Sequence, residues 1–494
     1  MAELPRLATA RGNIHYLRGV AAGDGIHYNV VGIIAAPALL ADAARLCPSA
    51  ICWDMSESRS PHESPTSGVS AQTLGLLAPY ESLTLRLIER YNRWGASLPA
   101  MRAVYIDLLR RMDDFLKAAT PDAVVFAEVP VNAWDFLLYQ LCTIRGIATP
   151  IVRPTAWHQR LLITPTIESM SGEDSAAPKA TQSLAHEQSD DYRPSRYLSD
   201  QVPLERSIGH QRLLGRRRLP LALRSSRSLR YLFGTRMPIL PDGVPEFDVS
   251  LLRRVIMEID DRRLHRRSLR AYEGVATESL PDQPFVLVAL HYQPEASTLG
   301  SGGNMDDQLN NVRLLAEAVP ADWRVVVREH PATYKFTQSA RRWRSEVMYR
   351  ELKRVPKVMC FSAAADMDNL IRQAELVATV TGTVGWEAVN AGKHVLVFGY
   401  PWYLDCPLVH RVTDTHSIRA AIEVGRTATQ ANDKGLLDGY IRRLHRSTVN
   451  FPGLEDDVSD EPLAPELYSS YSLAILRVSG ISNASGFGDQ RSSP

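Results

Sequence analysis

The sequence has few cysteines and no long hydrophobic run, and both absences exclude classes of protein. Only five of its 494 residues are cysteines and none are spaced as CxxC, so neither a disulfide framework nor a zinc ribbon is predicted. The longest apolar run, Val30 to Leu40, contains Pro37 and is about half of the roughly 20 residues that a membrane-spanning helix needs. The first residues lack the apolar core of a secretory signal. We therefore expect a cytoplasmic protein, in contact with a membrane at most peripherally on its inner face.

An excess of one charge is missing as well. The formal net charge is +1, so no global field argues for nucleic acid as a partner. Hydrophobic residues make up 45% and charged residues 22%, which is the balance of an ordinary soluble globular chain. A chain of 494 residues corresponds to about two to four domains.

What is present is an alternation of apolar runs and amphipathic segments in both halves. In the first half, strands are predicted over 30–35, 123–127 and 148–152, and helices over 82–94, 101–118 and 133–145. In the second half, strands are predicted over 285–290, 324–328, 358–361, 376–380 and 394–398, and helices over 306–319, 344–354, 368–374 and 384–391. Strand, helix and strand in succession indicate parallel sheets.

These patterns predict the α/β class, with two doubly wound Rossmann-like domains facing a cleft. Five regions are expected. They are an N-terminal α/β domain (1–165), a flexible linker or disordered insertion (166–205), a basic and mostly helical connector (206–280), a C-terminal Rossmann-like domain (285–450) and a C-terminal segment with a partly disordered tail (451–494).

Local positive charge is concentrated in the connector. Arg206 to Arg236 contains nine arginines and no acidic residue, and a second basic stretch, Arg253 to Arg270, follows on a predicted helix. Such a stretch is either a solvated helical surface or a patch for an anionic leaflet or an anionic glycan. Near an anionic surface each such charge contributes on the order of 1 kcal/mol.

Polar residues follow the carboxyl ends of the second-half strands, where open α/β sheets bind ligands. Glu329-His330-Pro331 comes directly after the strand at 324–328. A histidine held there by Pro331 can donate to a phosphate oxygen or protonate a leaving group, because its pKa lies near neutrality. The alternative is a purely structural histidine.

The strand at 376–380 is followed by Thr381-Gly382-Thr383-Val384-Gly385-Trp386-Glu387. Hydroxyls and glycines open a helix there whose first amides are free to bind an anion such as a nucleotide phosphate. Glu387, one turn along, could accept from ribose hydroxyls. The alternative is an ordinary helix start in which Glu387 complements the helix dipole.

A third polar loop, residues 291–303, leaves the strand at 285–290 and includes Gln293, Glu295 and a glycine-rich stretch. Its glycines would let the backbone approach a sugar or phosphate; the alternative is an ordinary loop with Asp306 capping the next helix. In the first half, Glu128 ends a buried strand. It is a candidate base or nucleophile on the other side of the cleft, or simply a solvated carboxylate.

No convincing metal site is present. The sequence has no HExxH, and Asp366-Met367-Asp368, although it spells DxD, precedes a helix and is interpreted as an N-cap region. Helix amides and His330 would then neutralise a leaving phosphate without a metal.

Together these motifs resemble a known family. HYQPEAST (291–298) with GG and DQ downstream, EHP (329–331), TGTVGWEA (381–388) and Trp402-Tyr403 resemble the capsule polysaccharide biosynthesis family, which includes β-Kdo transferases that build capsule glycolipid linkers. The resemblance extends over about 285–412, and the N-terminal half matches only loosely.

The resemblance implies a glycosyltransferase of the two-domain GT-B-like fold, acting in bacterial surface polysaccharide synthesis. The implied donor is a CMP-activated sugar, Kdo or a related acidic sugar, and the acceptor is a glycan or glycolipid; no cofactor is implied. His330 and the turn Thr381–Thr383 would hold the CMP phosphate, with Gln293 and Glu295 near the sugar or nucleotide. The family's catalytic carboxylate has no motif here, so Glu295 and Glu128 both stay candidates.

Two other classes remain open at this point. One is a UDP-sugar-using transferase, or a nucleotide-sugar epimerase or hydrolase of similar fold. The other is a non-catalytic glycan-binding or export-coupling protein. Membrane contact, if present, is expected through Arg206–Arg236.

Overall fold

The computed structural model describes eleven stretches of the chain: residues 4–10, 16–18, 28–35, 37–54, 68–90, 97–157, 160–169, 251–293, 296–334, 344–451 and 463–481. Three predictions lie outside these residues: most of the flexible linker, the arginine-rich stretch Arg206–Arg236 and the candidate Glu295.

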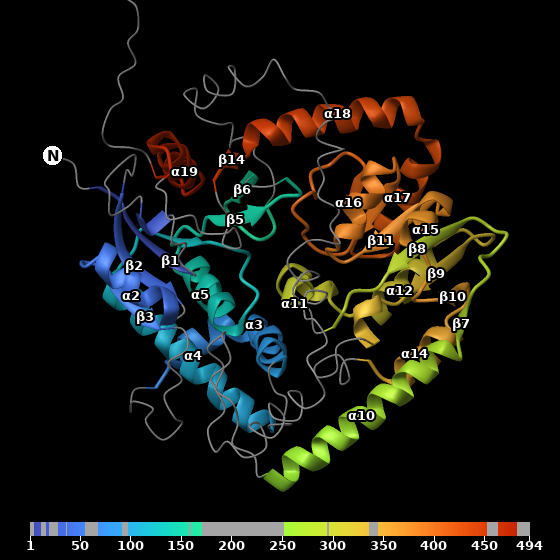
Figure 1. The fold of residues 1–494 in the computed structure, drawn as a ribbon, viewed down its shortest axis with the longest axis horizontal. Coiled ribbons are helices and arrows are strands. Elements are labelled where there is room, and N and C mark those ends of the chain that lie inside the picture. Colours follow the sequence, from blue (N-terminus) through green and yellow to red (C-terminus); the bar gives the residue numbers. More distant parts are fainter. Residues whose placement is uncertain are drawn as a thin grey trace, which may run out of the picture.

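The first lobe is built on a seven-stranded sheet with the order β14-β6-β5-β4-β1-β2-β3 (Figure 1). The five strands from β5 to β3 are parallel, and β6 and β14 pair antiparallel at one edge. The strands are β1 (Arg6–Ala10), β2 (Asn29–Ala35), β3 (Ile51–Asp54), β4 (Ala123–Phe126), β5 (Ile151–Pro154), β6 (Arg160–Thr164) and β14 (Val449–Asn450). The helices are α2 (Pro37–Leu46), α3 (Ala71–Glu89), α4 (Leu98–Ala119), α5 (Ala133–Ile144) and α19 (Pro465–Val478).

The second lobe holds another seven-stranded sheet, with the order β13-β12-β11-β8-β9-β10-β7, and all of its pairs are parallel. Its strands are β7 (Ala276–Thr277), β8 (Phe285–Ala289), β9 (Arg324–Arg328), β10 (Val358–Phe361), β11 (Leu376–Thr379), β12 (His394–Val397) and β13 (Val409–Arg411). Its helices are α10 (Leu251–Glu273), α11 (Ala296–Ser301), α12 (Gln308–Ala318), α14 (Glu346–Arg354), α15 (Met367–Gln373), α16 (Thr383–Asn390), α17 (Thr415–Thr427) and α18 (Gln430–Ser447). Two 3₁₀ turns, η4 (Gly303–Met305) and η5 (Pro331–Tyr334), complete it.

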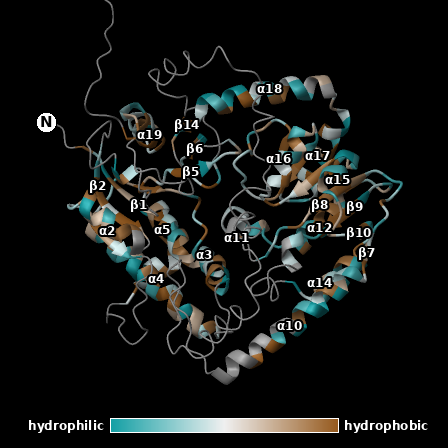
Figure 2. Cartoon of the chain, in the orientation of Figure 1, coloured by the Kyte–Doolittle hydropathy of each residue, from teal (hydrophilic) through white to brown (hydrophobic). Residues whose placement is uncertain are grey.

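Counted from β8, the second sheet has the strand order 3-2-1-4-5-6 that is typical of Rossmann folds, and β1 to β5 of the first sheet follow the same order as far as strand 5. The predicted fold class, two doubly wound Rossmann-like units, is therefore confirmed. The central strands are buried on both faces: β4, β8, β11 and β12 have no exposed residue. In Figure 2, β8 and its neighbour β9 are brown, hydrophobic arrows, and the helices around them carry teal residues. Burial on both faces is why these strands appear in the sequence as continuous apolar runs.

The carboxyl ends of the two sheets face each other. Arg153, at the end of β5, donates to the carbonyl oxygen of Tyr400, which follows β12, over 3.4 Å. Arg86 of α3 forms an ion pair with Asp306, and Leu299 of α11 is buried in the hydrophobic core of the first lobe. Figure 1 shows α11 between the two lobes and α18 running across them toward β14. None of the described helices is long and apolar enough to cross a bilayer.

Candidate functional site

The site lies where the strand order of the second sheet reverses. β8 and β11 are neighbours, yet the chain leaves them toward opposite sides of the sheet, and ligands of open α/β sheets bind at such a switch point. The loops that follow β8, β9 and β11 are the three loops that the sequence analysis selected. The structure joins them through one network of buried polar side chains.

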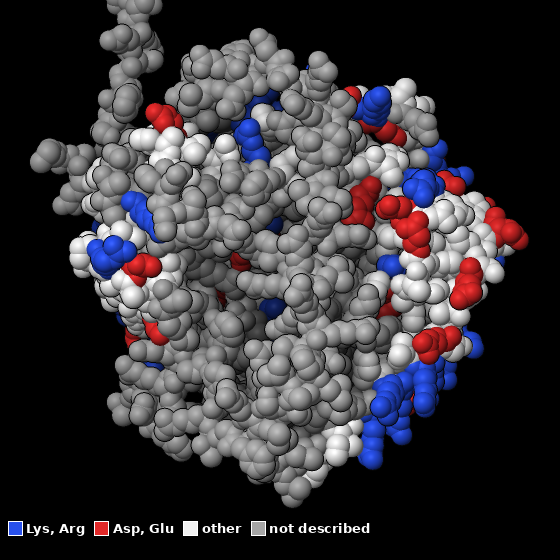
Figure 3. All heavy atoms as spheres, in the orientation of Figure 1, with Lys and Arg blue, Asp and Glu red and all other residues white. Residues whose placement is uncertain are grey.

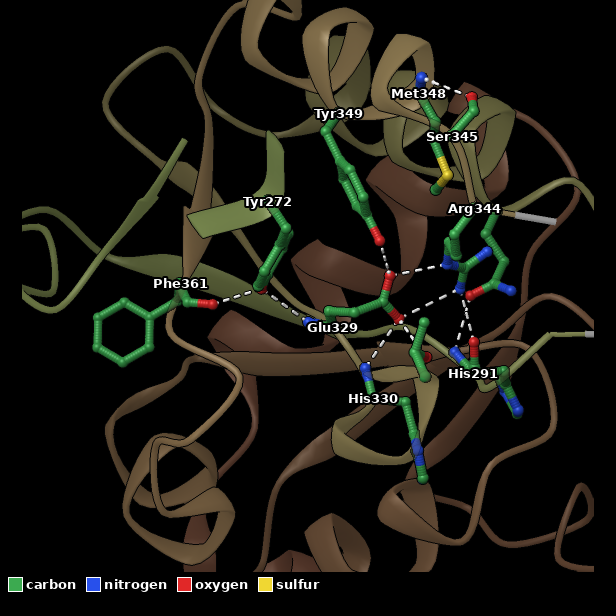
Figure 4. Close-up of polar contacts among 11 residues, drawn as sticks. Tyr272, His291, Glu329, His330, Arg344, Ser345, Met348, Tyr349 and Phe361 are labelled. Carbon is green, nitrogen blue, oxygen red and sulfur yellow. Dashed lines mark hydrogen bonds and ion pairs between the residues drawn. The ribbon is translucent and has the colours of Figure 1, made fainter. Parts of the chain in front are cut away.

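Glu329, directly after β9, is the centre of this network (Figure 4). Its side chain is 0% exposed, and its two carboxylate oxygens accept five hydrogen bonds from four residues, one of them from Arg344 Nη2 to Oε1 over 3.3 Å. Oε2 accepts from Arg344 Nε (2.7 Å) and the Tyr349 hydroxyl (2.6 Å), whereas Oε1 accepts from the backbone N–H of His330 (2.9 Å) and the Thr333 hydroxyl (3.2 Å). A carboxylate with this many donors has no free lone pair for a substrate. Glu329 is therefore a supporting residue that fixes the backbone at His330.

Arg344 connects this carboxylate to the neighbouring loop. It is 4% exposed, and its Nη2 also donates to the backbone oxygen of His291 over 2.6 Å. The sequence analysis did not find Arg344, because it lies 15 residues from Glu329 and is one of several arginines in its segment. Nothing in the local sequence distinguishes the buried arginine from its exposed neighbours.

His291, after β8, holds the turn between β11 and α16. Its Nε2 accepts from the backbone N–H groups of Val380 and Thr381, both over 3.2 Å, and lies 3.0 Å from the Thr379 hydroxyl. Because backbone amides can only donate, Nε2 is the acceptor and the ring proton lies on Nδ1. Within the predicted phosphate-binding turn, the amide of Thr381 is thus occupied, and that of Gly382 donates to the Thr379 hydroxyl over 3.3 Å. The amides at the start of α16 are left for a ligand.

The start of α16 is open and tightly supported. Gly382 is the N-cap and supplies no side-chain acceptor, so the first amides of the helix, those of Thr383 and Val384, have no capping oxygen. The Tyr403 hydroxyl donates to the carbonyl oxygen of Gly382 from behind, and a Cβ at Gly385 would overlap that hydroxyl. Gly385 is therefore required for the packing under this turn.

Glu387 lies one turn into α16, as expected, and its partners are protein groups. Burial raises the pKa of Tyr403, and the charge of Glu387 raises it further. Burial lowers the pKa of Arg328, and neighbouring acidic groups that include Glu387 oppose the shift. The predicted contact of Glu387 with a ribose remains a prediction.

Two other predicted residues carry buried oxygens without a partner among the described residues. Gln293 is 3% exposed and donates through Nε2 to Thr298 (2.8 Å), but its Oε1 is unpaired. The Thr381 hydroxyl oxygen is likewise buried and unpaired. Unpaired buried polar atoms are rare in folded proteins, and here they follow the two strands of the switch point. A bound ligand with hydroxyl or amide donors would satisfy both.

His330 lies in the second lobe and Glu128 in the first, as the sequence predicts. His330 is half-buried, its ring centroid is 6.4 Å from that of Tyr292, and Pro331 begins η5 directly after it. Glu128 is half-buried after β4 in the first lobe, two residues before Pro130, whose carbonyl oxygen contacts Gly300 of the second lobe. Glu128 therefore lies close to the contact between the lobes.

Two local expectations need correction. The glycine-rich stretch does not present its backbone to a ligand at Gly300 and Gly302, because a Cβ there would collide with Pro130 and with Thr298, so these glycines allow close packing of protein on protein. The cap of α12 is Asp307, which accepts from the amides of Leu309 and Asn310. Asp306 instead pairs with Arg86. The interpretation of Asp366 as an N-cap is confirmed, since it accepts from the amide of Asn369 over 3.3 Å.

A buried arginine at the contact between the lobes was also missed. Arg153 is 3% exposed and donates to Thr164 and to the carbonyl oxygens of Thr166, Ile167 and Tyr400. Burial lowers its pKa to about 10. In the described part of the chain, no three His, Cys, Asp or Glu side chains are grouped so as to hold a metal ion.

One family model matches the second lobe. Residues 240–448 match the model of the capsule polysaccharide biosynthesis protein family, and these residues include His291, Glu329, Arg344 and the whole turn into α16. The match spans the second lobe, and the resemblance found in the sequence is confirmed. No curated protein matches the chain.

Several solved structures are similar at a distance. A β-Kdo 2,7-transferase, KpsC of Thermosulfurimonas dismutans, is 17% identical with a TM-score of 0.21, over 35% of this chain and 57% of that one, or just over half of its length. A glycotransferase of kitacinnamycin is 12% identical with a TM-score of 0.24, over 90% of this chain and 96% of that one. The UDP-GlcNAc 2-epimerase of Methanocaldococcus jannaschii is 11% identical with a TM-score of 0.26, over 87% of this chain and 94% of that one. Likenesses this distant leave activity and substrate to be argued from the site.

Proposed function

We propose that the protein is a glycosyltransferase of surface polysaccharide synthesis that transfers a sugar, Kdo or a related acidic sugar, from a CMP-activated donor to a glycan or glycolipid. The observation that supports this most is the buried network from Glu329 through Arg344 to His291. It fixes three loops around the switch point within the residues that match the family. Such rigidity is what a site needs to stabilise charge that develops on a leaving group.

In the proposed reaction, the bond between the anomeric carbon and the phosphate oxygen of the donor breaks, and the acceptor hydroxyl oxygen forms the new bond. The phosphate leaves with additional negative charge. We propose that the open amides of Thr383 and Val384 and the side chain of His330 bind that charge. The unpaired oxygens of Gln293 and Thr381 would accept from hydroxyl or amino groups of the donor.

The acceptor hydroxyl loses a proton as it attacks. We assign the base to Glu128, because it lies in the first lobe near the contact with Gly300. Glu295 lies outside the described residues, so it stays the second candidate for this base. The donor half of the site is thus assigned to the second lobe and the acceptor half to the first.

A thermal-shift screen with CMP, CDP, UDP and GDP tests the nucleotide. We expect CMP to raise the melting temperature most, because a ligand at 100 times its Kd stabilises the folded state by about 2.7 kcal/mol. Release of CMP from a CMP-sugar should then require an acceptor. Preferential stabilisation by UDP, with an altered free sugar in the absence of acceptor, would instead identify an epimerase or hydrolase.

A further inference from the structure

Helix α10 is anchored to the site at one end only. Near its carboxyl end Ser268 and Tyr272 are buried, and the Tyr272 ring lies 5.1 Å from that of Tyr349. The Tyr272 hydroxyl accepts from the backbone N–H of Glu329 over 2.9 Å. The helix has 23 residues and is therefore about 35 Å long. Figure 1 shows it running along the edge of the second lobe with its amino-terminal half extending beyond the sheet.

The outward face of α10 carries arginines that lack strong partners. Arg263, Arg266, Arg267 and Arg270 are exposed, and at 100° per residue they lie on one side of the helix. Arg263 reaches Asp260 only at 3.7 Å, and among the described residues no carboxylate pairs with the other three. The blue spheres at the lower right of Figure 3 form a continuous positive strip along this helix.

The neighbouring helix α14 shows that exposed arginines in this region need not be unpaired. Arg354 of α14 lies 2.8 Å from Glu351, and Arg350 is 3.9 Å from Glu346. Glu351 also pairs with Arg313 of α12 over 3.2 Å. Arg354 of α14 is thus neutralised by a carboxylate on its own helix, whereas Arg266, Arg267 and Arg270 of α10 are left available to an external anion.

Two exposed isoleucines continue the arginine strip toward the free end of the helix. Ile256 is 50% exposed and Ile259 is 45% exposed, and both lie on the face that carries the arginines. The arginines supply attraction to anionic lipid headgroups, and exposed apolar side chains beside them add buried apolar area when they insert. A soluble polyanion would use the arginines but would gain nothing from the isoleucines.

We propose that the exposed face of α10 docks the protein on an anionic lipid surface, through Arg263, Arg266, Arg267 and Arg270 and through insertion of Ile256 and Ile259. This goes beyond the proposed transfer reaction. Because Tyr272 ties the same helix to Glu329, docking would hold the candidate site at a fixed distance from the lipid headgroups. An acceptor anchored in the bilayer would then reach the site without free diffusion.

Co-sedimentation of the full chain with vesicles tests the proposal. One set contains phosphatidylglycerol and phosphatidylcholine, and the other contains phosphatidylcholine alone. The test variant is R263Q/R266Q/R267Q/R270Q. The control, R45Q/R102Q/R350Q/R354Q, removes the same charge from four exposed arginines that have carboxylate partners. We expect the test variant to lose at least about tenfold in binding to anionic vesicles, since each arginine contributes a factor of about five near an anionic surface.

A second variant, I256S/I259S, separates a membrane from a soluble polyanion. It should weaken vesicle binding while leaving retention on heparin unchanged. Equal vesicle binding by the wild type, the test variant and the control would overturn the proposal. A second result would also overturn it: the wild type binds no vesicles, and the test variant loses the heparin retention that the wild type has. The arginine strip would then bind a soluble polyanion.

Discussion

The two sheets share a strand order, but the helices that follow equivalent strands begin in opposite ways. α5 follows β4 in the first sheet and α16 follows β11 in the second. The start of α5 is closed by its own Asp135, which is 2% exposed and accepts from the backbone N–H (2.7 Å) and side chain (2.9 Å) of Asn132. The start of α16 has only Gly382 and no side-chain acceptor. One fold used twice therefore provides one helix start that is open to an anion and one that already holds a carboxylate.

The regions around the two helix starts also differ in the space that they leave and in the polar groups that they hold. Near α16, Glu329, Arg344 and His291 form one buried polar network, whereas the carboxyl ends of β2 and β3 border a cavity of about 10 Å³. That cavity is lined by Trp53 and Trp134 together with Asp54 and Arg111. That volume holds about one water molecule. A cavity of that size leaves no room for a nucleotide phosphate. The comparison therefore supports the proposed assignment of the nucleotide to the second lobe.

Glu329→Gln should give the largest effect, because it removes the charge that Arg344 was buried to meet. Loss of one partner of a buried ion pair typically costs about 3 to 5 kcal/mol. Urea unfolding followed by tryptophan fluorescence should show the loss, and CMP binding should fall with it. Glu351→Gln is the matched control, since Glu351 forms ion pairs at the surface, and it should change stability by less than about 1 kcal/mol. Equal stability of both variants would mean that the network supports nothing.

His330→Ala should leave the fold intact and lower the turnover of sugar transfer by at least about a hundredfold, the usual scale for a positioned acid or phosphate ligand. Steady-state release of CMP from the donor measures the effect. His416→Ala, an exposed histidine on α17, is the control and should keep full activity. Unchanged turnover in the His330 variant would remove this residue from the mechanism.

Some strands of the molecule could be predicted from the sequence and others could not. The strands β9 and β10 were predicted with the bounds that the structure has, because each is a compact apolar run between polar flanks. β1, β3 and β13 were missed, since runs such as RLATA, ICWD and VHR are short and mixed and become strands only by pairing with neighbours.

The same division applies to the site. The three loops were found because strand ends and helix starts have local signatures. The partners that hold them were not, because the contact of Arg344 with Glu329 and the contact of His291 with Val380 exist only in the tertiary structure. Asp306 and Asp307 were confused for a similar reason, since only the position of Arg86 in the other lobe decides which of the two caps α12.

Acid should destabilise the second lobe at the edge of its sheet that β12 and β13 form. His394 lies 2.8 Å from His410 and 3.3 Å from Asp433, and burial, followed by the charge of His394, lowers the pKa of His410 to about 4. Because the unfolded histidine binds its proton near pH 6.5, stability should fall as the pH drops from about 6.5 to 4, by on the order of 2 kcal/mol. His410→Gln should reduce this slope only in part, because burial also lowers the pKa of His445 to about 4. Melting temperatures measured across that pH range check the slope, and a flat wild-type profile would contradict it.

Glu387→Ala should weaken CMP binding by about tenfold, whereas Thr383→Val should weaken it less because the backbone amide remains. Calorimetric titration of both variants with CMP and with an acceptor glycan separates the two halves of the site. If acceptor affinity falls and CMP affinity is untouched, the donor and acceptor halves have been assigned to the wrong lobes.

Asp135→Asn makes the most direct comparison of the two helix starts and has the smallest expected effect. The substitution keeps the shape of the cap but removes its charge, so α5 loses the favourable interaction between a carboxylate and its first amides. We expect a loss of about 1 kcal/mol in the free energy of unfolding, typical of a weakened N-cap, and no change in CMP affinity. Asp366→Asn, at the cap of α15 in the second lobe, is the matched control for the change in the free energy of unfolding. If Asp135→Asn instead changed CMP affinity, the first helix start would belong to the nucleotide site, and the contrast between the two sheets would no longer decide where the donor binds.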